Sequence, residues 1–304
     1  LQWQMVDRIA QRTKRVYIAG DDDQAIFKWA GARPEFLINM KGERKILDKS
    51  YRLPLKIQKK ATDLISRVKE RVDKQWSARE EEGEINYYPT EQLSKLTEGD
   101  WLVLARNKYT LDKLEENLKL NGYYYSRNNT TSVDSRVLKG IKSWESIRKG
   151  EKITYKEVKQ FYYFLHVDKS VEKGHKTLQR ADREALYDYK TLTTNHGLKV
   201  DSNLPWFEAL DSIPRIKSSY IRAVLRRGQN LDYSPKIKLS TIHGAKGGEA
   251  DNVMLLTDLS RRTDESYWKD KDEERRVFYV GMTRAKKSLN IVRSKTNREF
   301  SEAF

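Results

Sequence analysis

The chain has 304 residues, 60 Lys and Arg against 44 Asp and Glu, and no cysteine. Its 38% hydrophobic content indicates a folded chain of about two domains rather than a disordered tail. The absence of cysteine excludes disulfide scaffolds, Cys-ligated zinc, iron–sulfur clusters and thiol catalysis, and no apolar run reaches the ~18 residues that span a membrane. These features predict a cytoplasmic protein. The net charge of +16 favours a polyanionic partner, most commonly nucleic acid, over a basic surface kept for solubility.

The first part of the chain predicts a helix, a strand and a second helix. Apolar residues at helical spacing predict a helix over 1–11, and 15–19 is typical of a short buried strand. That strand is followed directly by the loop Gly20–Gln24, and 34–40 predicts a short helix. Because open α/β sheets bind ligands at the carboxyl ends of their strands, this loop is a candidate binding element.

The next part alternates strands and helices. Strands are predicted at 45–48, 84–88 and 100–105, the second of them at a sheet edge. Helices are predicted at 57–68, where the apolar residues are spaced by 4, 3, 1 and 3, and at 111–120. This alternation indicates an α/β fold with a parallel sheet.

From about 130 to 232 the strand signals disappear, and helical patterns such as 156–167 and 220–227 replace them. Residues 107–230 carry 24 basic and 15 acidic side chains, a net charge of about +9. We therefore expect a basic, all-helical insert. The α/β pattern then resumes. Strands are predicted at 236–242, 252–256 and 288–293, and a helix is predicted at 273–285.

Four clusters of polar and aromatic residues carry the chemistry, and they are Gly20–Ala32, Lys49–Leu53, Ser240–Glu249 and Glu274–Lys287. In this order they resemble motifs III, IV, V and VI of superfamily 1 DNA helicases of the UvrD/Rep type. In that family a RecA-like second motor domain is interrupted by a helical subdomain. The resemblance therefore implies a remnant of the first RecA-like domain at 1–42, the second RecA-like domain at 43–129 and 233–304, and the insert at 130–232.

The resemblance assigns the catalytic residues. Hydrolysis of a nucleoside triphosphate depends on positioning and on stabilising charge at the γ-phosphoryl oxygens, which favours arginine donors. Arg52 and Arg284 match the arginines that reach the γ-phosphate, and Gln24 matches the residue that senses it and orients the attacking water. Standing alone, these residues would be two surface ion pairs and a turn-capping glutamine.

The resemblance also implies an ATP-binding role for two further residues. Tyr51 would stack on the adenine, with a half-buried core tyrosine as the alternative. Glu249 would accept a hydrogen bond from the ribose, with a solvated surface carboxylate as the alternative.

A third group of residues is predicted to bind single-stranded DNA. Phe27 and Trp29 are two residues apart, so on an extended segment both rings would face the same way and stack on bases. Thr241, His243 and Lys246 match motif V groups that contact DNA or connect it to the nucleotide site. Core aromatics, a structural histidine and a surface lysine are the alternatives. No metal ligands are assigned, and the triplet Asp21–Asp23 is interpreted as a turn with solvated charges.

The sequence contains no Walker A motif, and Leu1–Asp7 resembles the helix that follows motif II in the family. The resemblance thus implies that an N-terminal half, which holds the phosphates of ATP and Mg²⁺, precedes this chain and is supplied by a partner if the gene is split. The leading hypothesis is the C-terminal portion of an ATP-dependent 3′–5′ DNA helicase that acts on single-stranded DNA and its junctions with duplex, in the cytoplasm or nucleoid. The isolated chain would then be inactive. A non-enzymatic module that binds single-stranded nucleic acid, and less strongly a nuclease, remain alternatives.

Overall fold

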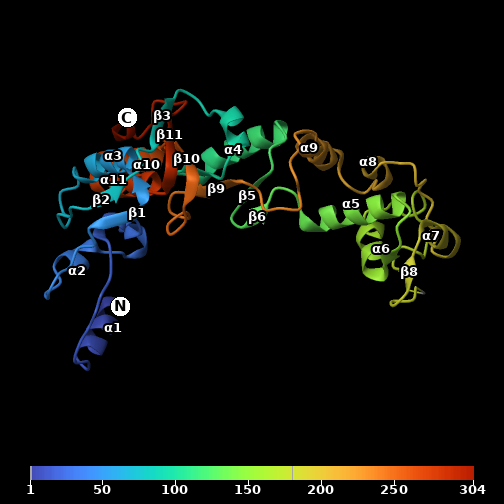
Figure 1. The fold of residues 1–304 in the computed structure, drawn as a ribbon, viewed down its shortest axis with the longest axis horizontal. Coiled ribbons are helices and arrows are strands. Elements are labelled where there is room, and N and C mark those ends of the chain that lie inside the picture. The colour runs from blue at the N-terminus through green and yellow to red at the C-terminus, as the bar shows by residue number, and fades with distance from the viewer. Residues whose placement is uncertain (1, 180) are drawn as a thin grey trace. The chain divides into compact units, whose positions relative to one another are not determined.

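The computed structural model describes residues 2–179 and 181–304, which form two compact units (Figure 1). The first unit contains residues up to 115 together with 236–304, and the second contains 116–235. The second unit includes all of the insert expected at 130–232. The finer division of the first unit into two RecA-like parts stays a prediction. In the described part of the chain, no helix is both long enough and apolar enough to cross a membrane.

The first unit is built on a parallel sheet, which confirms the predicted α/β class. Its strands lie in the order β3 (Glu84–Tyr88), β11 (Ala285–Val292), β10 (Ala250–Leu256), β4 (Trp101–Ala105) and β9 (Ile237–Thr241). All five residues of β4 are buried, which explains its uninterrupted apolar sequence. The strand expected at an edge, β3, does lie at the edge.

Helices α3 (Leu55–Ile65), α10 (Arg261–Lys269) and α11 (Lys271–Met282) complete the core of this unit. Helix α3 buries four of the five apolar residues whose spacing predicted it, and Val68 is buried after the helix ends. Helices α10 and α11 form the crossover between the parallel strands β10 and β11. On α11, the ring of Phe278 stacks on that of Phe300 with centroids 4.0 Å apart. The carboxyl end of α11 is thereby fixed against the core, and Arg284 follows immediately.

The second unit is mainly helical, and α4 (Lys108–Leu120) carries the chain into it. Its helices are α5 (Ser135–Arg148), α6 (Tyr155–Tyr162), α7 (Tyr189–Asn195), α8 (Trp206–Ala209) and α9 (Arg215–Arg226). The expectation that it is all-helical is wrong. It also holds the short strand pairs β5 (Tyr125–Arg127) with β6 (Thr130–Thr131) and β7 (Ile153–Thr154) with β8 (Leu186–Tyr187), which are too short to leave a periodic signal.

Two predicted strands are also wrong. Residues 15–19 and 45–48 have no regular structure, and all of them are exposed. A strand is stable only beside a partner, and no described strand forms a ladder with either segment, although the Asp48 carbonyl accepts from the Ser77 N–H at 2.7 Å. The chain instead forms β1 (Lys49–Pro54), which pairs in parallel with β2 (Ser77–Arg79). The helices expected near the N-terminus are confirmed as α1 (Gln2–Ala10) and α2 (Pro34–Ile38).

The turn before β3 generates a stability prediction. Gly83 has a φ of +68°, and a Cβ at this position would lie 2.6 Å from the Cβ of Pro54. We expect Gly83→Ala to lower the free energy of unfolding by about 2–4 kcal/mol, because backbone strain and a steric clash add together. Gly31 has a φ of +88° with nothing within 4 Å of the added Cβ, so Gly31→Ala should cost only about 1 kcal/mol. Urea denaturation of both variants tests this, and equal losses would contradict the clash.

Candidate functional site

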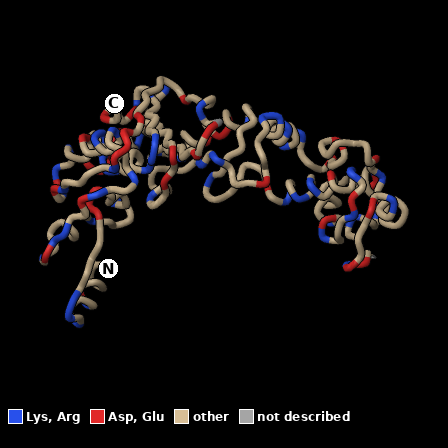
Figure 2. The backbone as a smooth tube through the Cα atoms, viewed as in Figure 1, with Lys and Arg blue, Asp and Glu red and all other residues tan. Residues whose placement is uncertain are grey.

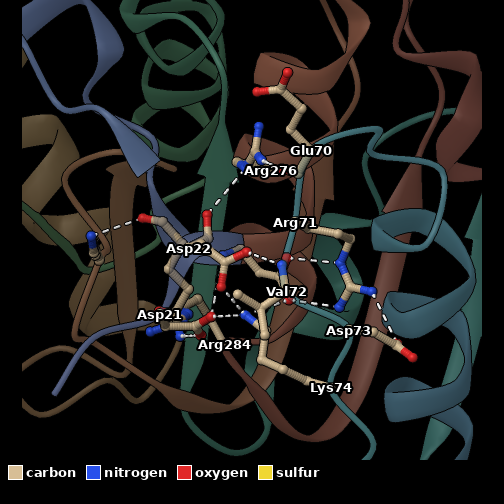
Figure 3. A network of polar contacts seen from close by, with 12 residues as sticks. Asp21, Asp22, Glu70, Arg71, Val72, Asp73, Lys74, Arg276 and Arg284 are labelled. Carbon is tan, nitrogen blue, oxygen red and sulfur yellow. Dashed lines mark hydrogen bonds and ion pairs between the residues drawn. The ribbon is translucent and has the colours of Figure 1, made fainter. Parts of the chain in front are cut away.

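The loop after Gly20 forms a 3₁₀ turn, Asp22–Gln24. Asp21 caps this turn, because its side chain accepts a hydrogen bond from the Asp23 backbone N–H at 3.2 Å. The prediction of solvated charges is wrong for Asp22 and Asp23, which are each 2% exposed. Their carboxylates are paired with Arg71 and Lys74, which lie in the segment between α3 and β2 (Figure 3).

Gln24 and Arg284 lie in direct contact. The Arg284 Nη2 donates to Gln24 Oε1 at 3.3 Å, and the Gln24 Nε2 donates to Asp21 Oδ2 at 2.6 Å. Three other acceptors hold the guanidinium. Nε donates to the Val280 carbonyl at 2.9 Å, Nη1 to the Gly248 carbonyl at 3.3 Å, and Nη2 also to the Thr283 Oγ1 at 3.1 Å. Arg284 is thus ordered, and it is only 2% exposed.

Arg52, on β1, is the second cation of the site. Its Nη1 lies 3.8 Å from Glu249 Oε2, and its buried Nε has no hydrogen-bond partner among the described residues. Burial and the positive charge of Arg52 lower the pKa of Arg284 to about 10, which still leaves Arg284 charged at neutral pH. Arg284 binds the Gly248 carbonyl and Arg52 pairs with the adjacent Glu249, so the two guanidinium groups share one site, with partial compensation from the carboxylates of Glu249 and Asp21. Such an arrangement favours the binding of an anion.

Of the two predicted ATP-binding residues, Tyr51 precedes Arg52 in the sequence and Glu249 pairs with it in space. Tyr51 lies on β1 and is 83% exposed, with the Lys49 ammonium 5.5 Å from the ring centroid. The ring is available for stacking and is not a core tyrosine. Glu249 contacts Arg52 and lies 3.7 Å from the Lys286 Nζ. The structure thus brings Gln24, Arg52, Arg284 and Glu249 together, while in the described part of the chain no hydrogen bond or ring contact joins the exposed Tyr51 ring to them.

The aromatic pair does not lie on an extended segment as expected. Phe27 caps a second 3₁₀ turn that contains Trp29, and their rings meet edge to face at 6.1 Å and 68°. Trp29 is 73% exposed, whereas Phe27 is half-buried, 5.7 Å from the His243 ring and 5.5 Å from the Lys246 Nζ. Trp29 is therefore not a core residue, and Phe27 joins it to motif V.

The residues of motif V connect the aromatic pair to Gln24. Thr241 ends β9, and its Oγ1 accepts from the Gly244 N–H at 3.1 Å, which fixes the turn. The Lys246 Nζ donates to the Gln24 carbonyl at 2.8 Å. His243 hydrogen-bonds the Ile26 backbone, and its buried Nε2 has no partner in the described chain. A ligand on the exposed Trp29 would thus be linked to Gln24 through Phe27 and Lys246.

Sequence reasoning missed several charged residues of this region. Arg106 donates from Nε and Nη2 to Glu274, at 2.7 and 2.8 Å. Its position directly after β4, at the carboxyl end of a parallel strand, was an available signal. Arg71 and Lys74 gave no signal, because they lie in an irregular segment and pair with acids about 50 residues away.

Comparison with known proteins shows similarity to one group of helicases. The UvrD-like helicase C-terminal domain model matches residues 217–296, and the UvrD/REP helicase N-terminal domain model matches residues 1–45. The ATP-dependent DNA helicase Rep of Escherichia coli is 22% identical over 99% of the chain and 59% of its own length. The chain is a relative of the UvrD/Rep-type helicases.

Shorter matches agree with this assignment. A probable DNA helicase II homolog of Rickettsia conorii is 39% identical over 77 residues, which cover 23% of this chain and 12% of that protein. A probable DNA helicase of Mycoplasma pneumoniae is 31% identical over 121 residues, 38% of this chain and 22% of that protein. The chain spans 59% of the length of Rep, and its shorter matches cover 12% and 22% of the other two proteins.

The environment of His243 predicts a pH dependence of stability. Burial, together with the charge of Arg106, lowers its pKa from 6.5 to about 4. Between these values the unfolded chain binds more protons than the folded chain, so the free energy of unfolding should fall as the pH drops from 6.5 to about 4, by on the order of 2–3 kcal/mol. In His243→Asn this contribution should vanish. Urea denaturation across that pH range tests it, and identical slopes in both proteins would contradict it.

Proposed function

We propose that this chain is the C-terminal portion of an ATP-dependent DNA helicase that moves 3′ to 5′ on single-stranded DNA. The observation that carries the proposal is the placement of two guanidinium groups, Arg52 and Arg284, in one site beside the Gln24 amide. A triphosphate offers the dense negative charge that this pair lacks, and the arginine fork matches phosphoryl oxygens. The motif matches and the similarity to Rep support the same assignment.

Each residue has a proposed role in ATP hydrolysis. Arg52 and Arg284 stabilise the negative charge that is spread over the γ-phosphoryl oxygens, and Gln24 orients the attacking water. Arg284 must exchange its hydrogen bond to Gln24 for one to phosphate, which frees the Gln24 oxygen for that water. Tyr51 stacks on the adenine and Glu249 accepts from a ribose hydroxyl.

The carboxylates that adjoin Gln24 do not fit the Mg²⁺ that such hydrolysis uses. Those of Asp22 and Asp23 are buried against Arg71 and Lys74, and Asp21 is shared between Lys74 and Gln24. A cation would have to displace these partners. We therefore place the Mg²⁺ ligands and the site for the remaining phosphates in an N-terminal half, which is the proposed protein partner.

Single-stranded DNA, including its junction with duplex, is the proposed nucleic-acid partner. Trp29 offers an exposed ring for base stacking, and Phe27, Thr241, His243 and Lys246 form the adjoining surface. Helix α9 carries Lys and Arg residues along its length (Figure 2), and we propose that they contact phosphates from the second unit. The Lys246 contact to Gln24 is the proposed connection between DNA and ATP.

The burial of Arg284 favours a second candidate function. With a guanidinium that is 2% exposed and held by four acceptors, the chain could be a non-enzymatic module that binds single-stranded nucleic acid. The two functions differ in what happens when an N-terminal half is supplied. With the N-terminal half supplied, we expect ATP hydrolysis only if the chain is part of a motor.

The proposed roles predict the behaviour of a fusion in which the Rep segment preceding the matched region is joined to Leu1. We expect DNA-stimulated ATP hydrolysis by the fusion, unwinding of duplexes with 3′ but not 5′ single-stranded tails, and no turnover by the isolated chain. Arg52→Ala and Arg284→Ala should each lower the turnover of the fusion by about 10³-fold. Arg261, which is exposed and paired with Glu265, provides the control Arg261→Ala. Full activity of either arginine variant would contradict the assignment.

The aromatic surface predicts a DNA-binding defect. Trp29→Ala should raise the dissociation constant for an oligothymidylate by about 5- to 100-fold, because one base–indole stack is lost. Trp268→Ala is the matched control, since Trp268 is 66% exposed on α10. Fluorescence anisotropy with labelled oligonucleotide, at fixed salt, measures both. Equal effects of the two substitutions would show that Trp29 has no special contact with DNA.

A further inference from the structure

The acidic triplet after Gly20 forms a charge network that the assigned functions leave unexplained (Figure 3). The Lys74 ammonium contacts all three carboxylates, with 2.8 Å to Asp21 Oδ1 and 3.0 Å to Asp23 Oδ2, and it also pairs with Asp22. Three negative charges at adjacent positions repel one another. The arrangement is stable because Arg71 and Lys74, in the segment 69–74, neutralise the carboxylates.

The carboxylates of Asp22 and Asp23 are hydrogen-bonded to the segment 69–74. The Asp22 Oδ2 accepts from the Val72 N–H at 2.8 Å, and the Asp23 carboxylate receives two hydrogen bonds from Arg71, at 3.0 and 2.9 Å. Arg276, on α11, links the loop to the segment, because it donates hydrogen bonds to the carbonyls of Asp22 and Glu70. These contacts fix the segment 69–74 against the loop.

Asp21 differs from its two neighbours, because its carboxylate links the segment to Gln24. One oxygen accepts from Lys74, while the other accepts from the Gln24 Nε2 at 2.6 Å. Burial acts to raise the pKa of Asp21, but the hydrogen bond and charge of Lys74 and the hydrogen bond from Gln24 outweigh it, so the pKa lies below its ordinary value. Asp21 is therefore an anion at neutral pH.

The anion determines which way the Gln24 amide points. With Nε2 held by the carboxylate, Oε1 faces the Arg284 guanidinium and accepts from it at 3.3 Å. Turning the amide by half a rotation would place its oxygen against a carboxylate and its NH₂ against a guanidinium, and both contacts would be repulsive. Asp21 thus selects the orientation in which the Gln24 oxygen faces the proposed phosphate site.

We propose that Asp21, held by Lys74, is a positioning residue that orients the Gln24 side chain, so that the segment 69–74 controls the geometry of the nucleotide site. This inference rests on the proposed function for its consequence in ATP binding. The orientation of the Gln24 amide is a property of the chain itself.

The test compares Asp21→Asn and Lys74→Met with Asp73→Asn in the full 304-residue chain. Asp73 is the matched control, because its side chain is 88% exposed and lies 3.8 Å from Arg71 at the edge of the network. The first readout is the pair of side-chain amide NMR resonances of Gln24, assigned by their loss in Gln24→Met. The second is the dissociation constant of ATP, obtained by titration. Circular dichroism establishes that each variant is folded.

We expect the Gln24 resonances to move in both Asp21→Asn and Lys74→Met, and to stay in place in Asp73→Asn. The dissociation constant for ATP should rise about tenfold in the first two variants, as expected for loss of a charge-assisted hydrogen bond. Unmoved Gln24 resonances in a folded Asp21→Asn or Lys74→Met chain would overturn the positioning role. If Asp21→Asn does not fold, Lys74→Met, which leaves the loop sequence intact, decides the question.

The two readouts separate this inference from the proposed function. Moved resonances in a chain that does not bind ATP would uphold the positioning role and reject the nucleotide site. Normal ATP binding by both variants, with moved resonances, would overturn the control of that site by the segment 69–74.

Discussion

The hydrogen bond between Arg284 and Gln24 is the contact on which the site depends. It joins the end of α11 to the loop after Gly20, two parts of the chain that are 260 residues apart. The parallel sheet makes this contact possible, because β10, α11 and β11 fix the position of Arg284, while the network of Asp22, Asp23 and Arg71 fixes the loop. Arg52 then lies close enough for its charge to lower the pKa of Arg284.

Holding the positive charges of Arg52 and Arg284 near each other costs electrostatic energy, and this cost indicates a functional site. Like charges are kept apart in ordinary surfaces, whereas sites for anions hold them together. This site is also connected to the aromatic pair, since Lys246 contacts both the Gln24 carbonyl and the Phe27 ring. In the proposed function, the nucleotide site and the DNA-binding surface are therefore connected through Lys246. A motor that converts ATP hydrolysis into movement on DNA requires such a connection.

Local signals predicted the core of the fold, whereas the candidate site residues were assigned by the resemblance to helicase motifs. The unbroken apolar run of β4 and the helical spacing in α3 marked buried elements, because packing on the sheet imposes those patterns. Segments 15–19 and 45–48 have strand-like sequences and yet are exposed, since a strand also needs a partner. The extended conformation expected for Phe27 and Trp29 was wrong because Gly31, with a positive φ, ends a 3₁₀ turn there. The burial of Asp22 and Asp23 was not predictable, because the cations that compensate them come from a distant irregular segment.

The central claim is that Arg52 and Arg284 recognise phosphate, and comparing ATP with AMP as ligands tests it most directly. Both nucleotides offer the adenine and ribose to Tyr51 and Glu249, but AMP lacks the β- and γ-phosphates. Isothermal titration of the 304-residue chain should show clearly tighter binding of ATP, and Arg52→Ala should remove the difference. Equal affinities for ATP and AMP in the unaltered chain would contradict the account.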